Sequence, residues 1–217
     1  MRTGCGQVRR ALFFGLLLVV LTGAVSNRWW PVTLDAAAAR DLPGRKASGV
    51  AGVWLSLSLM VADVATPAVT FLVTAVGAAL LARGRHDLGL ARVAARLVLL
   101  TASVLGGKAL LSRPGPPGSQ FHGVFGYYPS GHTATAMVCA VTLAGIGAQR
   151  RPDWRGRLLA ASASWTVLVG ASMVFHRFHW LSDVFAALLL GAVILLAVPL
   201  AGQRLGRDWS PERATST

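Results

Sequence analysis

Polar and ionisable residues gather in three short stretches of this otherwise apolar sequence. The first contains Lys108 and Arg113, the second is Pro129-Ser130-Gly131-His132, and the third extends from Ser172 to Asp183. Ionisable side chains are costly beside apolar segments long enough to cross a bilayer, so such a cluster indicates a functional site.

The charge types in these stretches indicate an anionic ligand. Lys108, Arg113 and Arg177 carry fixed positive charge, and an arginine can bind a phosphate through two parallel hydrogen bonds. Ser130 adds a hydroxyl group. Gly131 allows a backbone N–H to approach an anion closely, and a helix N-terminus at this position would favour negative charge. The expected ligand is therefore a phosphate.

The third stretch contains a histidine and a carboxylate at helical spacing. His179 and Asp183 are four residues apart, so on a helix they would share one face. A carboxylate in that position can hold the imidazole in one tautomer and stabilise its positive charge, as nucleophiles and general bases require. The competing interpretations are a structural hydrogen bond and a zinc site that adds His176. The joint occurrence of all three stretches, in this order, favours the catalytic interpretation.

The elements that must position these residues are apolar helices. The chain has 217 residues, of which 54% are hydrophobic and 13% charged, whereas roughly 25% are charged in an ordinary soluble domain. Apolar stretches of about 20 residues, separated by arginine-rich connectors, predict an all-α polytopic membrane protein: a bundle of about six transmembrane helices in a single domain, residues 1–217. We expect the spans at residues 11–30, 62–81, 88–111, 132–148, 158–175 and 184–203.

The distribution of arginine predicts the orientation of this bundle. The net charge is +13, and arginines precede the first span and follow the second, fourth and sixth. Positive residues mark cytoplasmic connectors, so both termini should be cytoplasmic and all three polar stretches should face outward, in the plasma membrane. The basic residues form no stripe on a soluble face with interleaved aromatic residues, which argues against nucleic-acid binding. The first span also resembles a signal sequence, and cleavage is left open.

Two connectors on the outer side carry weaker signals. Residues 33–60 are alanine-rich with scattered basic residues, which favours an interfacial helix. Its basic residues are open to two interpretations, attraction of anionic lipid headgroups and, more commonly, a plain connector that lies on the surface. The loop from Gly115 to Tyr128 contains several aromatic residues and could be a substrate-selecting lid or an ordinary surface loop.

The spacing of the three stretches resembles the three signature motifs of the type 2 phosphatidic acid phosphatase family. Residues 88–200 would form the family core. The resemblance implies that His179 attacks phosphorus, Asp183 orients it, and His132 protonates the departing oxygen and then activates water. It also implies that Lys108, Arg113, Ser130 and the Gly131 N–H hold the phosphoryl oxygens, with Ser172 as a further substrate contact. No metal or cofactor is expected, because Asp183 is the only carboxylate within the motif stretches.

The chain departs from the family pattern at two points. Four residues separate Lys108 from Arg113, where the longer form of the motif has six, and Met173 stands where the third motif usually has arginine. If the fifth span continues through His176, Arg177 would share a face with Met173 and could supply the missing charge.

The resulting prediction is a membrane phosphatase that hydrolyses a lipid phosphate monoester or diphosphate through a phosphohistidine. The alternative is a catalytically weak lipid-phosphate-binding protein of the same family, and the absence of arginine at position 173 supports it. A transporter is disfavoured because the spans lack paired charges at mid-membrane depth. The sequence leaves open which lipid phosphate is the substrate and whether the protein forms oligomers.

Overall fold

The computed structural model describes residues 2–41, 49–82, 89–119 and 125–199. These residues form eight α-helices and one 3-10 helix, which confirms the all-α prediction. In chain order the elements are α1 (Arg2–Ser26), α2 (Trp30–Asp41), α3 (Gly49–Val64), α4 (Pro67–Ala82), α5 (Leu90–Leu111), α6 (Gly131–Arg150), the 3-10 helix η1 (Pro152–Trp154), α7 (Arg155–Phe175) and α8 (Leu181–Ala197).

The prediction of about six spans is confirmed in part. Four segments of the described chain are long and apolar enough to cross a bilayer: Cys5–Ser26, Leu90–Leu111, Gly131–Arg150 and Pro152–Phe175. The pair α3 and α4 would be a fifth span if it is counted as one. Helix α8 is apolar but shorter, and the end of the predicted sixth span, residues 200–203, lies outside the described residues.

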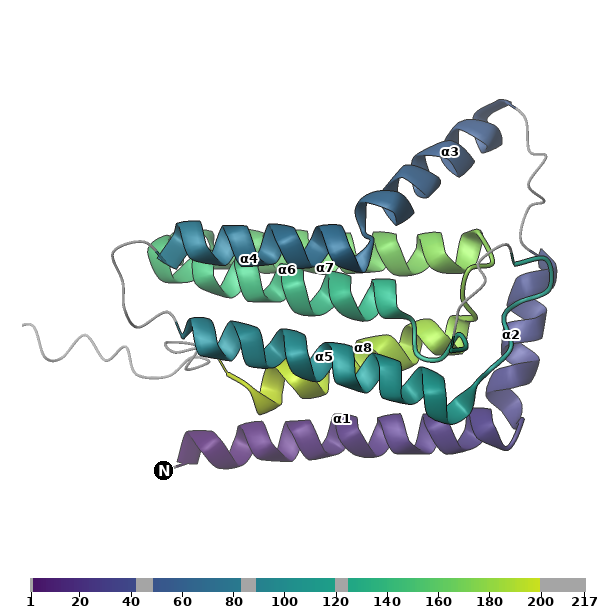
Figure 1. The fold of residues 1–217 in the computed structure, drawn as a ribbon, viewed down its shortest axis with the longest axis horizontal. Coiled ribbons are helices and arrows are strands. Elements are labelled where there is room, and N and C mark those ends of the chain that lie inside the picture. Colours follow the sequence, from purple (N-terminus) through teal and green to yellow (C-terminus); the bar gives the residue numbers. More distant parts are fainter. Residues whose placement is uncertain (1, 42–48, 83–88, 120–124, 200–217) are drawn as a thin grey trace, which may run out of the picture.

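The predicted span at 62–81 is wrong in its first turn, because the helix breaks there. Helix α3 ends at Val64 and α4 begins at Pro67, with an angle of 56° between the apolar parts of the two helices. Proline is favoured in the first turn of a helix, where its missing N–H costs nothing, and it disfavours helical geometry in the residue before it. Figure 1 shows α3 leaning away from the bundle while α4 lies along it.

The long helices lie side by side, and α2 lies across one end of them (Figure 1). At that end α1, α5 and α7 finish, and α6 and α8 begin. The three polar stretches lie at the end of α5, at the start of α6 and around the turn from α7 to α8. The alternating chain direction therefore brings them to the same end.

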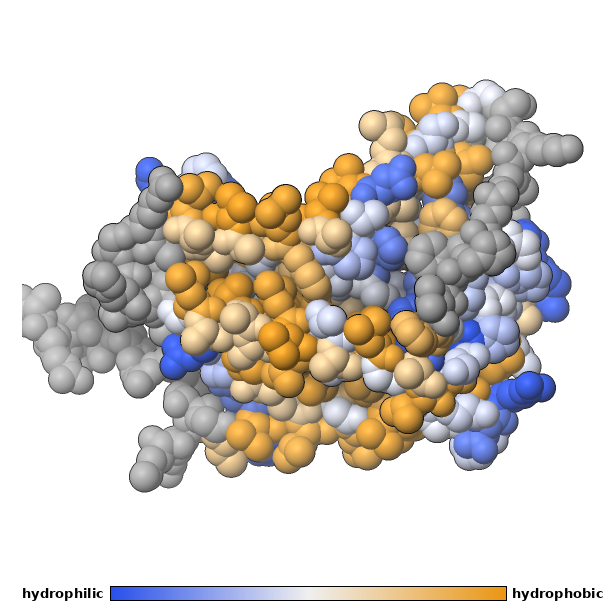
Figure 2. All heavy atoms as spheres, in the orientation of Figure 1, coloured by the Kyte–Doolittle hydropathy of each residue, from blue (hydrophilic) through white to orange (hydrophobic). Residues whose placement is uncertain are grey.

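The sides of the bundle are apolar, as a bilayer requires. Large hydrophobic side chains are exposed there, including Leu16, Leu72, Val98 and Val167, and Figure 2 shows hydrophobic residues over the long faces of the molecule. In water this surface would be unfavourable, whereas lipid chains solvate it. The chain is an integral membrane protein with several candidate spans.

Close contacts bring α6, α7 and α8 together. A Cβ atom built on Gly191 of α8 would lie 2.7 Å from Met137 Sδ of α6, and one built on Gly170 of α7 would lie 3.0 Å from Val184 Cγ1 of α8. Small residues at such positions allow transmembrane helices to approach closely. At the end opposite the polar stretches, buried Arg96 of α5 donates to the carbonyl oxygen of Val198, just beyond α8, at 2.8 Å.

Candidate active site

The second motif forms the N-terminus of α6, as the sequence predicted. Ser130 is the N-cap residue and fully buried, and its Oγ accepts a hydrogen bond from the Thr133 N–H at 3.4 Å. The Ser130 N–H donates to the Asp183 carbonyl oxygen at 3.1 Å. The start of α6 is thereby tied to the start of α8, and the Gly131 N–H lies in the first turn, where the helix dipole favours an anion.

Gly131→Ala is expected to lower kcat/KM by about tenfold or more without lowering Tm. A Cβ atom at this position would meet only Val104 Cγ1 at 3.5 Å, an ordinary contact, and alanine is the better helix former. The methyl group would instead stand beside the N–H that is expected to receive phosphate. Gly170→Ala is the matched control, because its Cβ would press on Val184 Cγ1 at 3.0 Å and should lower Tm. An unchanged kcat/KM for Gly131→Ala would show that the Gly131 N–H does not bind the phosphate.

The third motif brings His179 and Asp183 into contact, but not on a helix face. Helix α8 begins only at Leu181, so His179 lies in the turn before it. Asp183 Oδ2 accepts from the Trp180 N–H at 3.0 Å and lies 3.4 Å from His179 Nδ1. Both side chains are buried. The capping interaction at the helix N-terminus therefore aims the carboxylate at Nδ1, so that a nucleophilic role for His179, as the sequence predicts, would fall to Nε2.

Arg113 lies between two carboxylates. Its Nη1 donates to Asp183 Oδ1 and, at 2.7 Å, to Ser182 Oγ, and its Nη2 donates to Asp35 Oδ2 at 2.6 Å. The guanidinium carbon lies 5.5 Å from the centre of the Trp180 ring, so the charge also contacts an aromatic face. These described contacts make Arg113 a bridge between α2 and α8, and its expected contact with phosphoryl oxygens stays a prediction.

Lys108 and the loop before α6 complete this end of the bundle. Lys108 Nζ donates to the Gly126 carbonyl oxygen at 2.8 Å. The Tyr127 ring stands edge-on to the His179 ring with 5.9 Å between centroids, and the buried Tyr128 hydroxyl bonds Thr22 of α1 at 2.7 Å. Burial raises the pKa of Tyr128, so this hydroxyl stays protonated. The described part of the loop therefore packs over the histidine.

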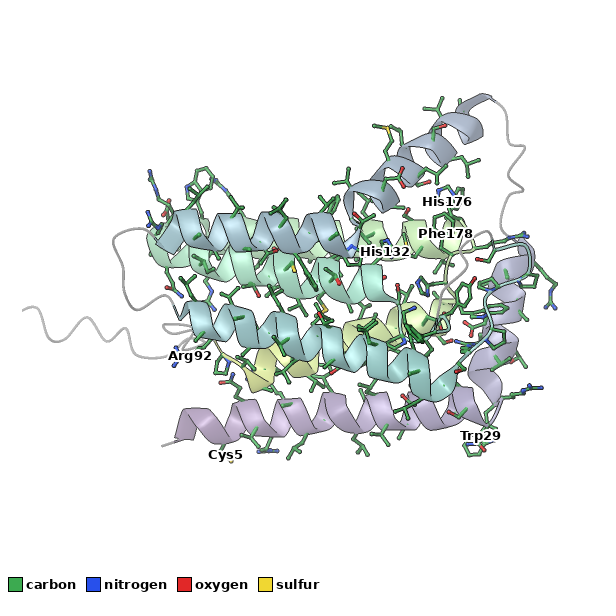
Figure 3. The ribbon with its side chains drawn as sticks, viewed as in Figure 1. Cys5, Trp29, Arg92, His132, His176 and Phe178 are labelled. Atoms are coloured by element: carbon green, nitrogen blue, oxygen red, sulfur yellow. The ribbon has the colours of Figure 1, made fainter. Side chains whose placement is uncertain are left out.

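His132 lies one residue inside α6 and is half-buried. It is within electrostatic range of His179 and Lys108, which come from the other two motifs. Figure 3 shows His132 at the same end of the bundle as His176 and Phe178. The three motifs thus contribute to one site, as their order predicted.

Ser172 and His176 face α3 in their described contacts. Ser172 Oγ donates to the Ser58 carbonyl oxygen, and His176 Nε2 lies 2.7 Å from Ser58 Oγ. The His176 ring also stacks on Phe178, with 5.5 Å between centroids. Among the described residues, no three His, Cys, Asp or Glu side chains gather as metal ligands would. In particular, His176, His179 and Asp183 do not form such a group.

The prediction that Arg177 continues the helix of Met173 is wrong. Helix α7 ends at Phe175, and Arg177 has a φ of 56°, so it does not continue the helix that carries Met173. Met173 is itself buried in an apolar cluster with Ala62 and Val184. Arg177 nevertheless lines a small pocket together with Asp35 and His179. Its proximity to the site comes from the turn after α7.

Sequence reasoning missed Asp35, whose carboxylate lies 2.6 Å from Arg113 Nη2. The residue lies in the segment interpreted as an interfacial helix, and α2 does lie across the end of the bundle (Figure 1). The available signal was an acidic residue within an alanine-rich stretch on the same predicted side as the motifs. Its partners could not be inferred, because they are distant in sequence.

Comparison with known proteins identifies the family. Residues 88–207, more than half of the chain, match the model of the PAP2 superfamily. The chain belongs to the PAP2 superfamily. The matched region contains all three motifs and begins at residue 88, the predicted start of the family core. The family resemblance drawn from the motifs is confirmed.

One known protein resembles part of this PAP2 chain in sequence, and another resembles most of it in structure. A lipid A 1-phosphatase of Porphyromonas gingivalis is 34% identical over 98 residues, which are 45% of this chain and 20% of that protein. The chain thus spans about a fifth of that relative. A crystal structure described as the first transmembrane PAP2 type phosphatidylglycerolphosphate phosphatase, from Bacillus subtilis, matches with a TM-score of 0.67 and 18% identity, covering 87% of this chain and 94% of that one. This second likeness establishes the transmembrane fold.

Proposed function

We propose that this PAP2 protein is a membrane phosphatase that hydrolyses a lipid phosphate monoester or diphosphate through a phosphohistidine. The observation that carries the proposal is the buried pair of His179 Nδ1 and Asp183 Oδ2, 3.4 Å apart, with Arg113 of the first motif on the same carboxylate. The names of the two relatives, both lipid phosphatases, support the substrate class.

In the proposed reaction, His179 Nε2 attacks phosphorus and the bond from phosphorus to the leaving oxygen breaks. His132 donates a proton to that oxygen, then takes a proton from water as the water attacks the phosphohistidine and releases inorganic phosphate. Lys108, Arg113 and the Gly131 N–H would stabilise charge on the equatorial oxygens, which supplies most of the catalysis in phosphoryl transfer. Ser130 and Arg177 are proposed as further substrate contacts, whereas the Ser172 hydroxyl donates to the Ser58 carbonyl oxygen and faces α3.

A groove of mixed polar and apolar lining beside Arg113 supports a lipid phosphate substrate. Arg113, Pro114 and Trp180 line it together with the ends of α1 and α5 and the start of α2, which contribute the apolar Val25, Val32, Leu110 and Leu111 and the polar Ser26 and Arg28. Leu110 is 85% exposed. A substrate chain could remain in the bilayer along this groove while its phosphate reaches Arg113.

We propose that the site faces outward, with both termini in the cytoplasm. Phe125→Cys should then react with a membrane-impermeant thiol reagent in intact cells, whereas Arg155→Cys should react only after lysis. Phe125 is exposed at the site end, and Arg155 begins α7 at the other end. Both variants are made with Cys5→Ser and Cys139→Ala, which remove the native thiols. The reverse labelling pattern would overturn the orientation.

Purified protein is expected to release phosphate from short-chain lipid phosphates in the presence of a metal chelator, and vanadate should inhibit the release. Phosphatidate, phosphatidylglycerophosphate and a short polyprenyl diphosphate, assayed side by side, would identify the preferred headgroup. Activity lost in chelator and restored by zinc would contradict the metal-independent mechanism.

The alternative is a weak, lipid-phosphate-binding member of the family. It is favoured by Met173, which is buried among apolar side chains where the third motif usually has a cation. Binding of these lipids without phosphate release would support this alternative over the enzyme.

A further inference from the structure

Asp35 reaches the site from outside the part of the chain that defines the family. It belongs to α2, whereas the family match begins at residue 88. Its side chain is 2% exposed. The two carboxylate oxygens accept hydrogen bonds from Arg113 Nη2 at 2.6 Å, from the Ser182 N–H at 2.8 Å and from Ser182 Oγ. A buried carboxylate with this many donors is held firmly in one position.

One of these contacts fixes the guanidinium of Arg113. Nη2 is held by Asp35, while Nη1 is held by Asp183 and Ser182. An arginine side chain has about 2 kcal/mol of rotamer entropy, and contacts on both nitrogens remove that freedom before substrate arrives. Asp35 therefore limits where Arg113 can present its charge.

Another contact fixes the first turn of α8. Ser182 is the second residue of α8, and its N–H is one of the helix-terminal donors that lack a partner within the helix. Asp35 Oδ1 accepts it, so a negative charge also stands at the positive end of the helix dipole. The next residue is Asp183, which orients His179. The carboxylate of α2 thus contacts Arg113 and the first turn of α8, and Asp183 of that turn contacts the proposed nucleophile.

We propose that Asp35 is a positioning residue of the phosphoryl-transfer site and also weakens the hold of that site on free phosphate. The first effect follows from its grip on Arg113 and α8. The second follows from charge: Asp35 and Asp183 together place two carboxylates on one guanidinium, which lowers its attraction for an anion. Such a balance favours release of inorganic phosphate after each turnover. This inference rests on the proposed function for its effect on rate, but its effect on anion binding can be measured without turnover.

Asp35→Asn tests both effects, because the amide oxygen can still accept the Ser182 N–H while the charge on Arg113 and the site is lost. We expect kcat to fall by about tenfold or more because Arg113 is less well placed. We expect inorganic phosphate to bind about three- to tenfold more tightly, since a like charge near the anion has been removed. Turnover is measured with the lipid phosphate that the parent hydrolyses fastest. Phosphate affinity is measured by calorimetry and by its effect on Tm.

Asp153→Asn is the matched control, because Asp153 is exposed in η1 at the other end of the bundle. It removes the same charge and should leave both quantities unchanged. A purely structural role for Asp35 would reduce the folded fraction of Asp35→Asn and leave the phosphate affinity of the folded protein at the parent value. That result, or a parent-like kcat, would overturn the proposal.

Asp35→Glu tests the inference if the asparagine variant does not fold. It keeps the charge and moves it by one methylene group, so kcat should fall while phosphate affinity stays near the parent value. Parent-like turnover by this variant would count against positioning. If the parent hydrolyses none of the lipids, the proposed function fails, and tighter phosphate binding by Asp35→Asn would still support the charge effect.

Discussion

His179→Ala is expected to lower phosphate release by at least about 10⁴-fold, because the variant has no nitrogen with which to form the covalent intermediate. The parent enzyme, quenched in denaturant during turnover of a phosphate-labelled lipid, should carry acid-labile label that is stable to alkali, as phosphohistidine is. The variant should carry none. Normal turnover by His179→Ala would end the assignment of His179 as nucleophile.

His176→Ala is the matched control for this experiment, since His176 lies three residues away and is also buried. Its described contacts are with Ser58, Phe175 and Phe178, on the side of α3. Loss of a buried hydrogen bond should destabilise the protein by about 1–3 kcal/mol. The folded fraction should nevertheless retain kcat within about tenfold. Equal loss of activity in both variants would favour a site that uses both histidines, as the zinc interpretation does.

Asp183→Asn is expected to lower kcat by about 10²–10⁴-fold, the usual scale for losing an orienting carboxylate beside a catalytic histidine. Asp183 is fully buried, and its carboxylate accepts hydrogen bonds from Arg113 and the Trp180 N–H and contacts His179 Nδ1. An asparagine has one acceptor oxygen for these three donors, so the histidine loses either its orientation or its tautomer. Thermal unfolding in detergent should show a lower Tm as well, since a buried charge-assisted hydrogen bond is lost.

The kinetic pattern distinguishes orientation from general destabilisation. Asp183→Asn should reduce kcat and kcat/KM together, because the interaction matters most in the transition state. Asp153→Asn should be indistinguishable from the parent. A variant with unchanged kcat and a raised KM would show that Asp183 contributes to substrate binding alone.

Much of the fold could be predicted because apolar segments of bilayer length have few alternatives to helix. Every backbone polar group inside a membrane must be bonded internally, so such segments form helices whatever their neighbours are. Helix boundaries depended on local chemistry: the start of α6 at Gly131 was visible in its Ser130 cap. The break before Pro67 could also have been anticipated from the proline, but the direction in which α3 leaves the bundle depends on its packing against α7.

Arg177 illustrates the limit of reasoning from helical spacing. The four-residue interval from Met173 has meaning only inside one helix, and α7 ends at Phe175. The end is fixed by the turn itself, in which the N–H groups of Phe178 and His179 both donate to the Met173 carbonyl oxygen. Left-handed geometry at Arg177 is unusual for a residue with a Cβ atom, so the sequence carried no signal for it.

The sequence by itself determined the helices, the family and the chemical types at the site, because residue spacing and bilayer length are local properties of the chain. His179, Asp183, His132 and the first-motif cations were all proposed as site residues from order and spacing. The tertiary structure decided which partners those groups have. Asp35 and Arg113 are 78 residues apart in the chain, yet their side chains form an ion pair. That pairing arises because α2 crosses the end of the bundle, and only the packed structure brings such distant charges into contact.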